Sequence, residues 1–185
     1  LTCDAFGVLP PISKLNIEQA MYHFISGYTA KIAGTEEGIN EPIAVFSACF
    51  GEPFLPLHPQ KYADLLAQNL AKNHVNVWLI NTGWIGGAYG VGSRIKLKYT
   101  RAMIKAALEG KLDAVEYQNF PIFNFQVPVN CPDVPQEYMF PIHTWKNPND
   151  YNHQLKDLAN RFIHNFDKFR KDCATSTLAG EPKIL

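Results

Sequence analysis

The sequence predicts a globular protein in which helices and strands alternate, of the α/β or α+β class. Apolar residues make up 46% of its 185 residues, enough to form a sizeable core. Segments with apolar residues at helical spacing are separated by short continuous apolar runs, which are typical of buried strands. The 12 glycines and 13 prolines are close to average usage, which excludes collagen-like and low-complexity chains.

Two helices are expected in the first half of the chain. Asn16 and Gln19 have the spacing of a capping box, and we expect the helix that they begin to end near residue 31. Its apolar stripe consists of Ile17, Ala20, Met21, Phe24, Ile25 and Tyr28. Pro59 suits the first turn of the second helix. One face of that helix would carry Tyr62, Leu65, Leu66, Asn69 and Leu70.

Two more helices are expected in the second half. The third covers about residues 100–109 and is stopped by Gly110. The longest begins at Asn147-Pro148 and covers about residues 148–170. Its stripe consists of Tyr151, Leu155, Leu158, Ala159, Phe162, Ile163 and Phe166. Between these helices, residues 120–141 are dense in proline and aromatic residues, which predicts irregular or edge structure.

Short strands and two loops complete the expected fold. The strands cover residues 43–46 and 75–80. Residues 33–42 are polar and contain glycine, which predicts a surface loop with scope for movement. Residues 82–93 include five glycines and predict a glycine-rich loop. The uncharged stretch 75–93 is long enough to span a membrane, but its polar residues and glycines favour a buried strand followed by a loop, so we expect a soluble protein.

The overall charge and the cysteines argue against several function classes. Seventeen Lys and Arg residues balance 17 Asp and Glu residues, so there is no electrostatic reason to expect nucleic acid or an anionic membrane as a partner. The four cysteines lie far apart without C-x-x-C spacing, which argues against zinc ribbons and thioredoxin-like motifs and favours free thiols. Cys49 lies among apolar residues, which favours an inert thiol over a nucleophile.

The chain is expected to be a piece of a longer protein. Charged residues are only 18% of the sequence, below the roughly 25% of typical soluble domains. A domain with so little charge is expected to bury more of its surface than a free-standing one. The sequence also begins at Leu1 without an initiator methionine or a targeting pattern.

An uneven distribution of charge points to an anion site. No Asp or Glu occurs between Leu65 and Leu108. The cations that follow the glycine-rich loop are Arg94, Lys96, Lys98, Arg101 and Lys105. Glycines allow backbone N–H groups to approach a ligand, and a helix N-terminus favours negative charge, so a phosphate or nucleotide site is one interpretation. The other is a solvated basic strand with alternating cations pointing outward.

No complete catalytic motif is present in the sequence. Gly87 and Gly92 have the spacing of a Walker A motif, but Ser93 precedes Arg94 where the motif needs Lys followed by Ser or Thr. The lysine that would contact the β- and γ-phosphates is therefore missing. The histidines lack an H-x-x-x-H partner or a carboxylate at ligand spacing, so structural roles are favoured and no metal ligands are expected.

Several long blocks carry a resemblance to a known enzyme family. They are Leu1-Thr-Cys-Asp-Ala-Phe-Gly-Val-Leu-Pro-Pro11, Phe24-Ile-Ser-Gly-Tyr-Thr-Ala-Lys-Ile-Ala-Gly-Thr-Glu36, Phe46-Ser-Ala-Cys-Phe-Gly51, Val77-Trp-Leu-Ile-Asn-Thr-Gly-Trp84 and Gly90-Val-Gly-Ser-Arg-Ile-Lys-Leu-Lys-Tyr-Thr-Arg101. Together they resemble ATP-dependent phosphoenolpyruvate carboxykinase, in order from residue 1 to about 171, with a tail that is only loosely similar. The resemblance implies an α/β fold in which residues 1–185 form the C-terminal part of the carboxykinase nucleotide-binding domain, a mixed sheet with flanking helices.

The resemblance also implies a function. The family converts oxaloacetate and ATP to phosphoenolpyruvate, ADP and carbon dioxide in gluconeogenesis, in the cytoplasm, with a divalent metal (Mn²⁺ or Mg²⁺). The metal ligands, the Walker-type lysine and the oxaloacetate-binding residues are implied to lie outside these residues, so the chain alone is expected to be inactive. ATP and oxaloacetate or phosphoenolpyruvate are the implied partners, without nucleic acid or membrane.

Particular residues match the family's functional positions. Arg94 would stack on or hydrogen-bond to the nucleotide, Ile95 would supply a backbone or apolar contact, and Thr100 a hydroxyl or backbone bond. The loop 33–42 matches the active-site lid, with lid residues Ala33, Gly34, Thr35, Glu36, Glu37 and Gly38. A competing interpretation is a stand-alone nucleotide-binding or structural module without catalysis, and an upstream reading frame with a glycine-rich loop, lysine and His/Asp metal ligands would decide for the enzyme.

Overall fold

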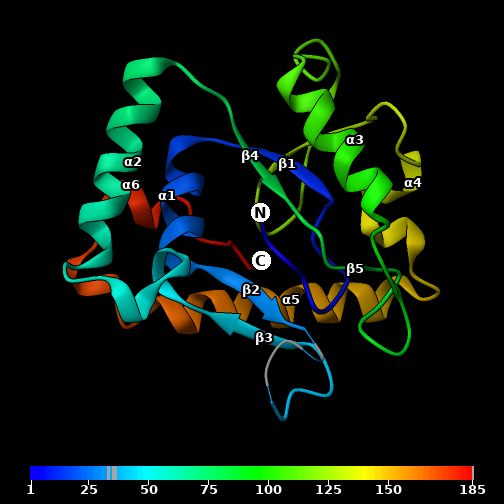
Figure 1. Cartoon of the computed structure of the whole chain (residues 1–185), viewed down its shortest axis with the longest axis horizontal. Coiled ribbons are helices and arrows are strands. Elements are labelled where there is room, and N and C mark those ends of the chain that lie inside the picture. The colour runs from blue at the N-terminus through cyan, green and yellow to red at the C-terminus, as the bar shows by residue number, and fades with distance from the viewer. Residues whose placement is uncertain (33, 35–36, 185) are drawn as a thin grey trace.

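The structure is a computed structural model that describes residues 1–32, 34 and 37–184 (Figure 1). Its strands are β1 (Ile12–Leu15), β2 (Tyr28–Lys31), β3 (Ile43–Phe46), β4 (Val77–Ile80), β5 (Trp84–Ile85), β6 (Ser93–Arg94), β7 (Tyr117–Asn119) and β8 (Gln126–Pro128). Its α-helices are α1 (Ile17–Ser26), α2 (Pro59–Asn73), α3 (Leu97–Leu108), α4 (Gln136–Met139), α5 (Pro148–Phe166) and α6 (Thr175–Leu178). None of the helices described here is both long and apolar enough to cross a membrane.

The central sheet has four strands in the order β4-β1-β8-β7. Its three strand pairs are antiparallel, and β1 pairs with β4 in the register Ile12 opposite Ile80. A single parallel bridge, between Thr2 and Asn81, brings the start of the chain beside the end of β4. Helices flank this sheet, with α5 crossing the molecule along one side in Figure 1. The expected α/β fold class is confirmed, although among the described residues the parallel pairing expected of a mixed sheet is limited to this bridge.

Helix α1 begins as the sequence predicts but ends earlier. Both bonds of the capping box form, since the Gln19 backbone N–H donates to Asn16 Oδ1 and the Asn16 N–H donates to Gln19 Oε1. The prediction that this helix runs to residue 31 is wrong, because Gly27 turns into the left-handed conformation with φ of 57°. Residues Tyr28–Lys31 instead form β2, which pairs with β3. A glycine just after the last turn commonly ends a helix, so Gly27 could have predicted this end of α1.

Helix α2 begins at Pro59 as expected, but its buried face differs from the prediction. His58 caps it by accepting the Gln60 N–H at Nδ1. Ala63 is fully buried, whereas the side chain of Leu65 is 56% exposed and Asn69 is exposed as well. The face that packs on the core is therefore rotated toward the small residues, which allow α2 to lie close to α1.

Helices α3 and α5 agree more closely with the sequence. Helix α3 starts at Leu97, three residues before the expected start, and Gly110 follows it with φ of 68°. Helix α5 starts at Pro148 with Asn147 as its cap and ends at Phe166, before a short 3-10 turn over Arg170–Asp172. The predicted α5 stripe is buried except for Ile163, which is half-buried.

Two segments predicted as loops or irregular structure contain strands. The glycine-rich loop 82–93 contains β5, which pairs with β6 in a small hairpin in which Trp84 lies opposite Arg94. Within residues 120–141, β8 takes an interior position in the sheet rather than an edge. Three phenylalanines of this segment are buried in the core, Phe120, Phe123 and Phe125.

Candidate functional site

The three residues expected to contact a nucleotide meet at one hollow on the surface. It has a volume of about 350 Å³, and its lining consists of Thr82, Arg94, Ile95, Leu97 and Thr100. The residues come from the segment after β4, from β6, from the link between β6 and α3, and from the first turn of α3. A volume of this size is within the range of small-molecule pockets, roughly 300–1,000 Å³. The structure thus brings Arg94, Ile95 and Thr100 together.

Arg94 lies at the exposed rim of this hollow. Its Nε donates to the Thr82 carbonyl oxygen at 3.1 Å, and its guanidinium carbon is 5.7 Å from the centre of the Trp84 ring. This bond uses one of the five N–H donors of a guanidinium, a group suited to anions and to stacking on planar rings. The Trp84 ring and the Thr82 carbonyl therefore orient a cation whose outer face is exposed to solvent.

Ile95 and Thr100 form the inner wall. The Ile95 N–H donates to the Gly83 carbonyl oxygen at 2.8 Å, so its backbone donor is occupied, and its side chain is only 5% exposed. Thr100 lies in the first turn of α3 and is 7% exposed. The implied contacts of Ile95 with a nucleotide were a backbone contact or an apolar one. Because the backbone N–H is already used, the apolar contact is the one that this geometry favours.

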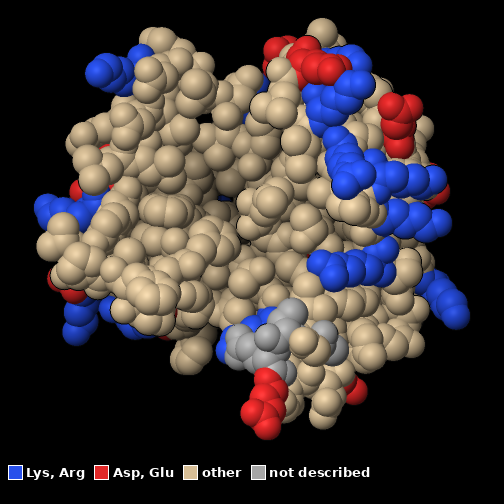
Figure 2. All heavy atoms as spheres, in the orientation of Figure 1, with Lys and Arg blue, Asp and Glu red and all other residues tan. Residues whose placement is uncertain are grey.

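The hollow lies at a strongly cationic helix start. Lys96 immediately precedes α3, Lys98 lies in its first turn, and that turn contains no acidic residue. Figure 2 shows Lys and Arg side chains gathered in a band over α3 and the segment leading into it. The interpretation as a basic strand with alternating cations is wrong, because Lys98 is helical and only Arg94 lies in a strand. Positive side chains and the helix dipole both favour an anion here.

The start of the chain supports the backbone beneath the hollow. Asp4 is fully buried, and its carboxylate accepts the Tyr28 hydroxyl and backbone N–H groups. Burial raises the pKa of this carboxyl, while these hydrogen bonds act in the opposite direction. The Asp4 carbonyl in turn accepts the Trp84 N–H at 2.9 Å. The hydrogen-bonded Asp4 thus fixes the position of Trp84, whose ring lies against the Arg94 guanidinium.

The predicted lid residues are placed only in part. Ala33, Thr35 and Glu36 lie outside the described residues. Gly34, Glu37 and Gly38 are exposed in the connection between β2 and β3. None of these three belongs to the lining of the hollow at Arg94.

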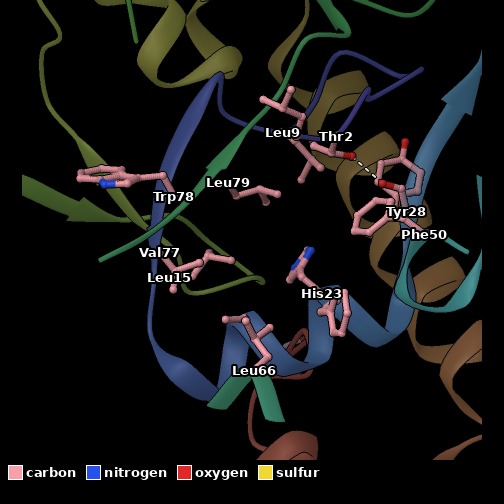
Figure 3. A pocket seen from close by; sticks show the side chains of 13 residues that line it. Thr2, Leu9, Leu15, His23, Tyr28, Phe50, Leu66, Val77, Trp78 and Leu79 are labelled. Carbon is pink, nitrogen blue, oxygen red and sulfur yellow. Dashed lines mark hydrogen bonds between the residues drawn. The ribbon is translucent and has the colours of Figure 1, made fainter. Parts of the chain in front are cut away.

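A second cavity, of about 150 Å³, is apolar (Figure 3). Side chains from β1, β4, α1 and α2 surround it, including Leu15, Leu66 and Leu79. His23 points into it from α1, and its Nε2 has no hydrogen-bond partner. Burial lowers the pKa of His23 to about 3, so the imidazole is neutral near pH 7. The described residues that line this cavity carry no charged side chain, which makes it unsuited to a phosphate-bearing ligand.

Metal-binding and nucleophilic groups give no further site in the described part of the chain. No group of three or more His, Cys, Asp or Glu side chains there is placed to hold a metal ion. The four cysteines are free thiols, as expected. Burial raises the pKa of Cys49 to about 11, which makes its thiolate, the reactive form, scarce near pH 7.

Sequence reasoning missed two residues of the hollow, Thr82 and Leu97. Thr82 lies two residues after the end of β4, and its carbonyl accepts a hydrogen bond from Arg94 because β5 and β6 fold back on each other. Two short segments on either side of a group of glycines are typical of a β-hairpin, and this pattern could have predicted the pairing. Leu97 is 62% exposed at the first position of α3, where no apolar periodicity identifies it.

Comparison with known proteins identifies the family. The family model for phosphoenolpyruvate carboxykinase matches residues 1–137. Proteins named "Phosphoenolpyruvate carboxykinase (ATP)" from Christiangramia forsetii and Brevibacillus brevis are each 57% identical to this chain, over 98% and 100% of it and 34% and 35% of their own length. The one from Dictyostelium discoideum is 53% identical over 98% of the chain and 32% of its own length. The chain spans about a third of the length of these relatives. It belongs to the phosphoenolpyruvate carboxykinase family.

Proposed function

We propose that this chain supplies the adenosine side of the ATP site in an ATP-dependent phosphoenolpyruvate carboxykinase. The complete enzyme would convert oxaloacetate and ATP to phosphoenolpyruvate, ADP and carbon dioxide, as a lyase of gluconeogenesis in the cytoplasm. The names of the relatives support the reaction. The observation that carries the assignment to this part of the chain is the meeting of Arg94, Ile95 and Thr100 at one cationic hollow.

The cationic and apolar groups at the hollow would have different tasks in this function. Arg94 would stack on the base or bond to the nucleotide, since the Trp84 ring and the Thr82 carbonyl hold its guanidinium at the rim. The apolar side chains of Ile95 and Leu97 would pack against the flat face of the base or against the ribose. The start of α3 and its lysines would attract the phosphates.

The divalent metal that the family implies does not fit the residues described here. They contain no cluster of carboxylates, histidines and thiols for it. The glycine-rich loop also has Arg94 after Ser93, instead of a lysine followed by Ser or Thr. We therefore assign metal binding, the phosphate-contacting lysine and oxaloacetate binding to parts of the carboxykinase outside these residues.

The loop 33–42 is proposed as the lid of the same enzyme. It connects the two strands of the β2–β3 hairpin, and the described residues Gly34, Glu37 and Gly38 are exposed there. Gly34 and Gly38 have positive φ, and no other part of the molecule lies within 4 Å of where their β-carbons would be. The open space around Gly34 and Gly38 leaves room for the movement that closure over bound substrates requires.

The function is tested by removing the guanidinium of Arg94 in the full-length carboxykinase that contains this chain. A hydrogen bond to a charged group contributes about 1.5–3 kcal/mol, so Arg94→Ala should weaken ATP binding roughly ten- to a hundredfold in calorimetry. Oxaloacetate binding should change little. The matched control is Arg161→Ala, which removes the same charge from α5, where Arg161 bonds Asp157 of its own helix. Unchanged ATP affinity in the Arg94 variant would refute the assignment.

A further inference from the structure

Asn81, directly after β4, is the most completely bonded buried amide near the hollow. The residue is 0% exposed. Its Oδ1 accepts the N–H of Asp4 at 3.0 Å and that of Gly83 at 2.8 Å, and its Nδ2 donates to the Leu9 carbonyl oxygen at 3.0 Å. One side chain therefore joins the start of the chain to the turn that follows β4.

The two residues after Asn81, Thr82 and Gly83, accept hydrogen bonds from two residues that are proposed to contact the nucleotide. The Thr82 carbonyl accepts the Nε of Arg94 at 3.1 Å, and the Gly83 carbonyl accepts the N–H of Ile95 at 2.8 Å. Gly83 also crosses Asp4 so closely that a β-carbon on it would lie 2.1 Å from the Asp4 carbonyl oxygen. A shift of the backbone at Gly83 would therefore move the hydrogen-bond acceptors of both Arg94 and Ile95.

We propose that Asn81 is a positioning residue for the nucleotide, acting through Gly83 on Arg94 and Ile95. Its side chain is not part of the lining of the hollow, so it acts without touching the ligand. The atom responsible is Oδ1, because it holds the Gly83 N–H. This inference rests on the proposed function and adds a residue to which that function assigns no role.

Two substitutions separate positioning from stability in the full-length carboxykinase that contains this chain. Asn81→Ala removes both acceptor bonds and should raise the KM for ATP at least fivefold, with the KM for oxaloacetate within twofold of the wild type. Asn81→Asp keeps an oxygen for both N–H groups and loses the donor to the Leu9 carbonyl. It should lower the thermal midpoint of unfolding while the KM for ATP stays within twofold of the wild type.

Gln19→Ala is the matched control. Gln19 is also a buried amide, with hydrogen bonds to Asn16, Phe123 and Asn124, and it is not part of the hollow. Its removal should lower the unfolding midpoint and leave the KM for ATP unchanged. An equal rise in this KM for the Gln19 and Asn81 variants would show a general effect of stability and overturn the inference.

The outcomes also distinguish this inference from the proposed function. If Arg94→Ala weakens ATP binding and folded Asn81→Ala does not change the KM for ATP, the positioning role is refuted and the function stands. If neither variant affects ATP, the proposed site fails. If Asn81→Ala does not fold, Asn81→Ser replaces it, since its shorter side chain cannot bond both N–H groups. The same rise is then expected, and an unchanged KM overturns the inference equally.

Discussion

The residues around the hollow at Arg94 show why sequence motifs identify only part of this site. Arg94, Ile95 and Thr100 were located by resemblance to a family, and the structure shows that they share one hollow. Two of them are held by backbone carbonyls, Arg94 by that of Thr82 and Ile95 by that of Gly83, and the Asn81 side chain accepts the Gly83 N–H. The two carbonyl contacts join positions 12 residues apart, and no spacing rule in the sequence describes them.

The environment of His23 leads to a prediction about pH. Its imidazole packs against Phe125 and Phe162 with ring centres 4.9 and 5.0 Å away, and burial lowers its pKa to about 3. The unfolded chain therefore binds a proton near pH 6.5 that the folded chain does not bind until about pH 3. Stability from this group is complete above pH 6.5 and falls by about 1.4 kcal/mol per pH unit between these values.

This pH dependence can be measured as a difference between two proteins. At pH 5, the unfolding free energy of the wild type should be about 2 kcal/mol lower than at pH 7 on account of His23. His23→Phe should lose that part of the dependence, while the contribution of the carboxylates stays in both proteins. Identical pH profiles from chemical denaturation would show that His23 is not buried in its neutral form.

At the scale of elements, Gly27 decides where α1 ends and the β2–β3 hairpin begins. Its φ is 57°, and a β-carbon on it would lie 1.7 Å from the Ser47 carbonyl oxygen. Gly27→Ala should therefore destabilise the protein by about 3 kcal/mol or more. Gly38→Ala is the control, since Gly38 has φ of 82° but nothing within 4 Å, and only the left-handed strain of about 1–2 kcal/mol should apply. Equal urea midpoints for the two variants would contradict this account.

The elements also show how far the sequence determines the fold. The starts of α1, α2 and α5 were predictable because Asn16, Pro59 and Asn147 act within one turn of their own helix. The face of α2 was not, because the close approach of α1 selects the small residue Ala63 over the larger Leu65. The interior position of β8 depends on pairing with β1, more than 100 residues earlier, which local patterns do not encode.

The β2–β3 connection carries a prediction about catalysis. Replacing residues 33–42 by Gly-Gly in the full-length carboxykinase should lower phosphoenolpyruvate formation by about a hundredfold, because an open site would admit water to the enolate. ATP affinity should stay within a few-fold, since Gly34, Glu37 and Gly38 do not line the hollow. Steady-state kinetics and nucleotide titration on one variant test both parts. A near-normal kcat would reduce the segment to a simple connection between strands.

At the scale of the whole molecule, several large apolar residues of the described chain are exposed. Phe54 and Leu108, for example, are 87% and 83% exposed. The chain also spans about a third of the length of its relatives. These observations fit a part of a larger enzyme that shares its surface and its chemistry with the remainder.

The isolated chain is accordingly expected to show no carboxykinase activity. Its described residues provide no metal-binding cluster, and the sequence has no lysine in the Walker position. The assay combines the purified 185-residue chain with oxaloacetate, ATP and Mn²⁺, and the full-length enzyme serves as the positive control. Turnover above the buffer background would show that the chemistry attributed to other parts resides in this chain.

The central claim is that the adenosine of ATP binds at the hollow between Thr82 and the start of α3. The most direct measurement is photolabelling of the full-length carboxykinase with 8-azido-ATP, followed by mass spectrometry of the labelled peptides. Label should appear in peptides covering residues 82–101 and disappear when excess ATP competes. ATP-sensitive label confined to peptides outside this chain would contradict it.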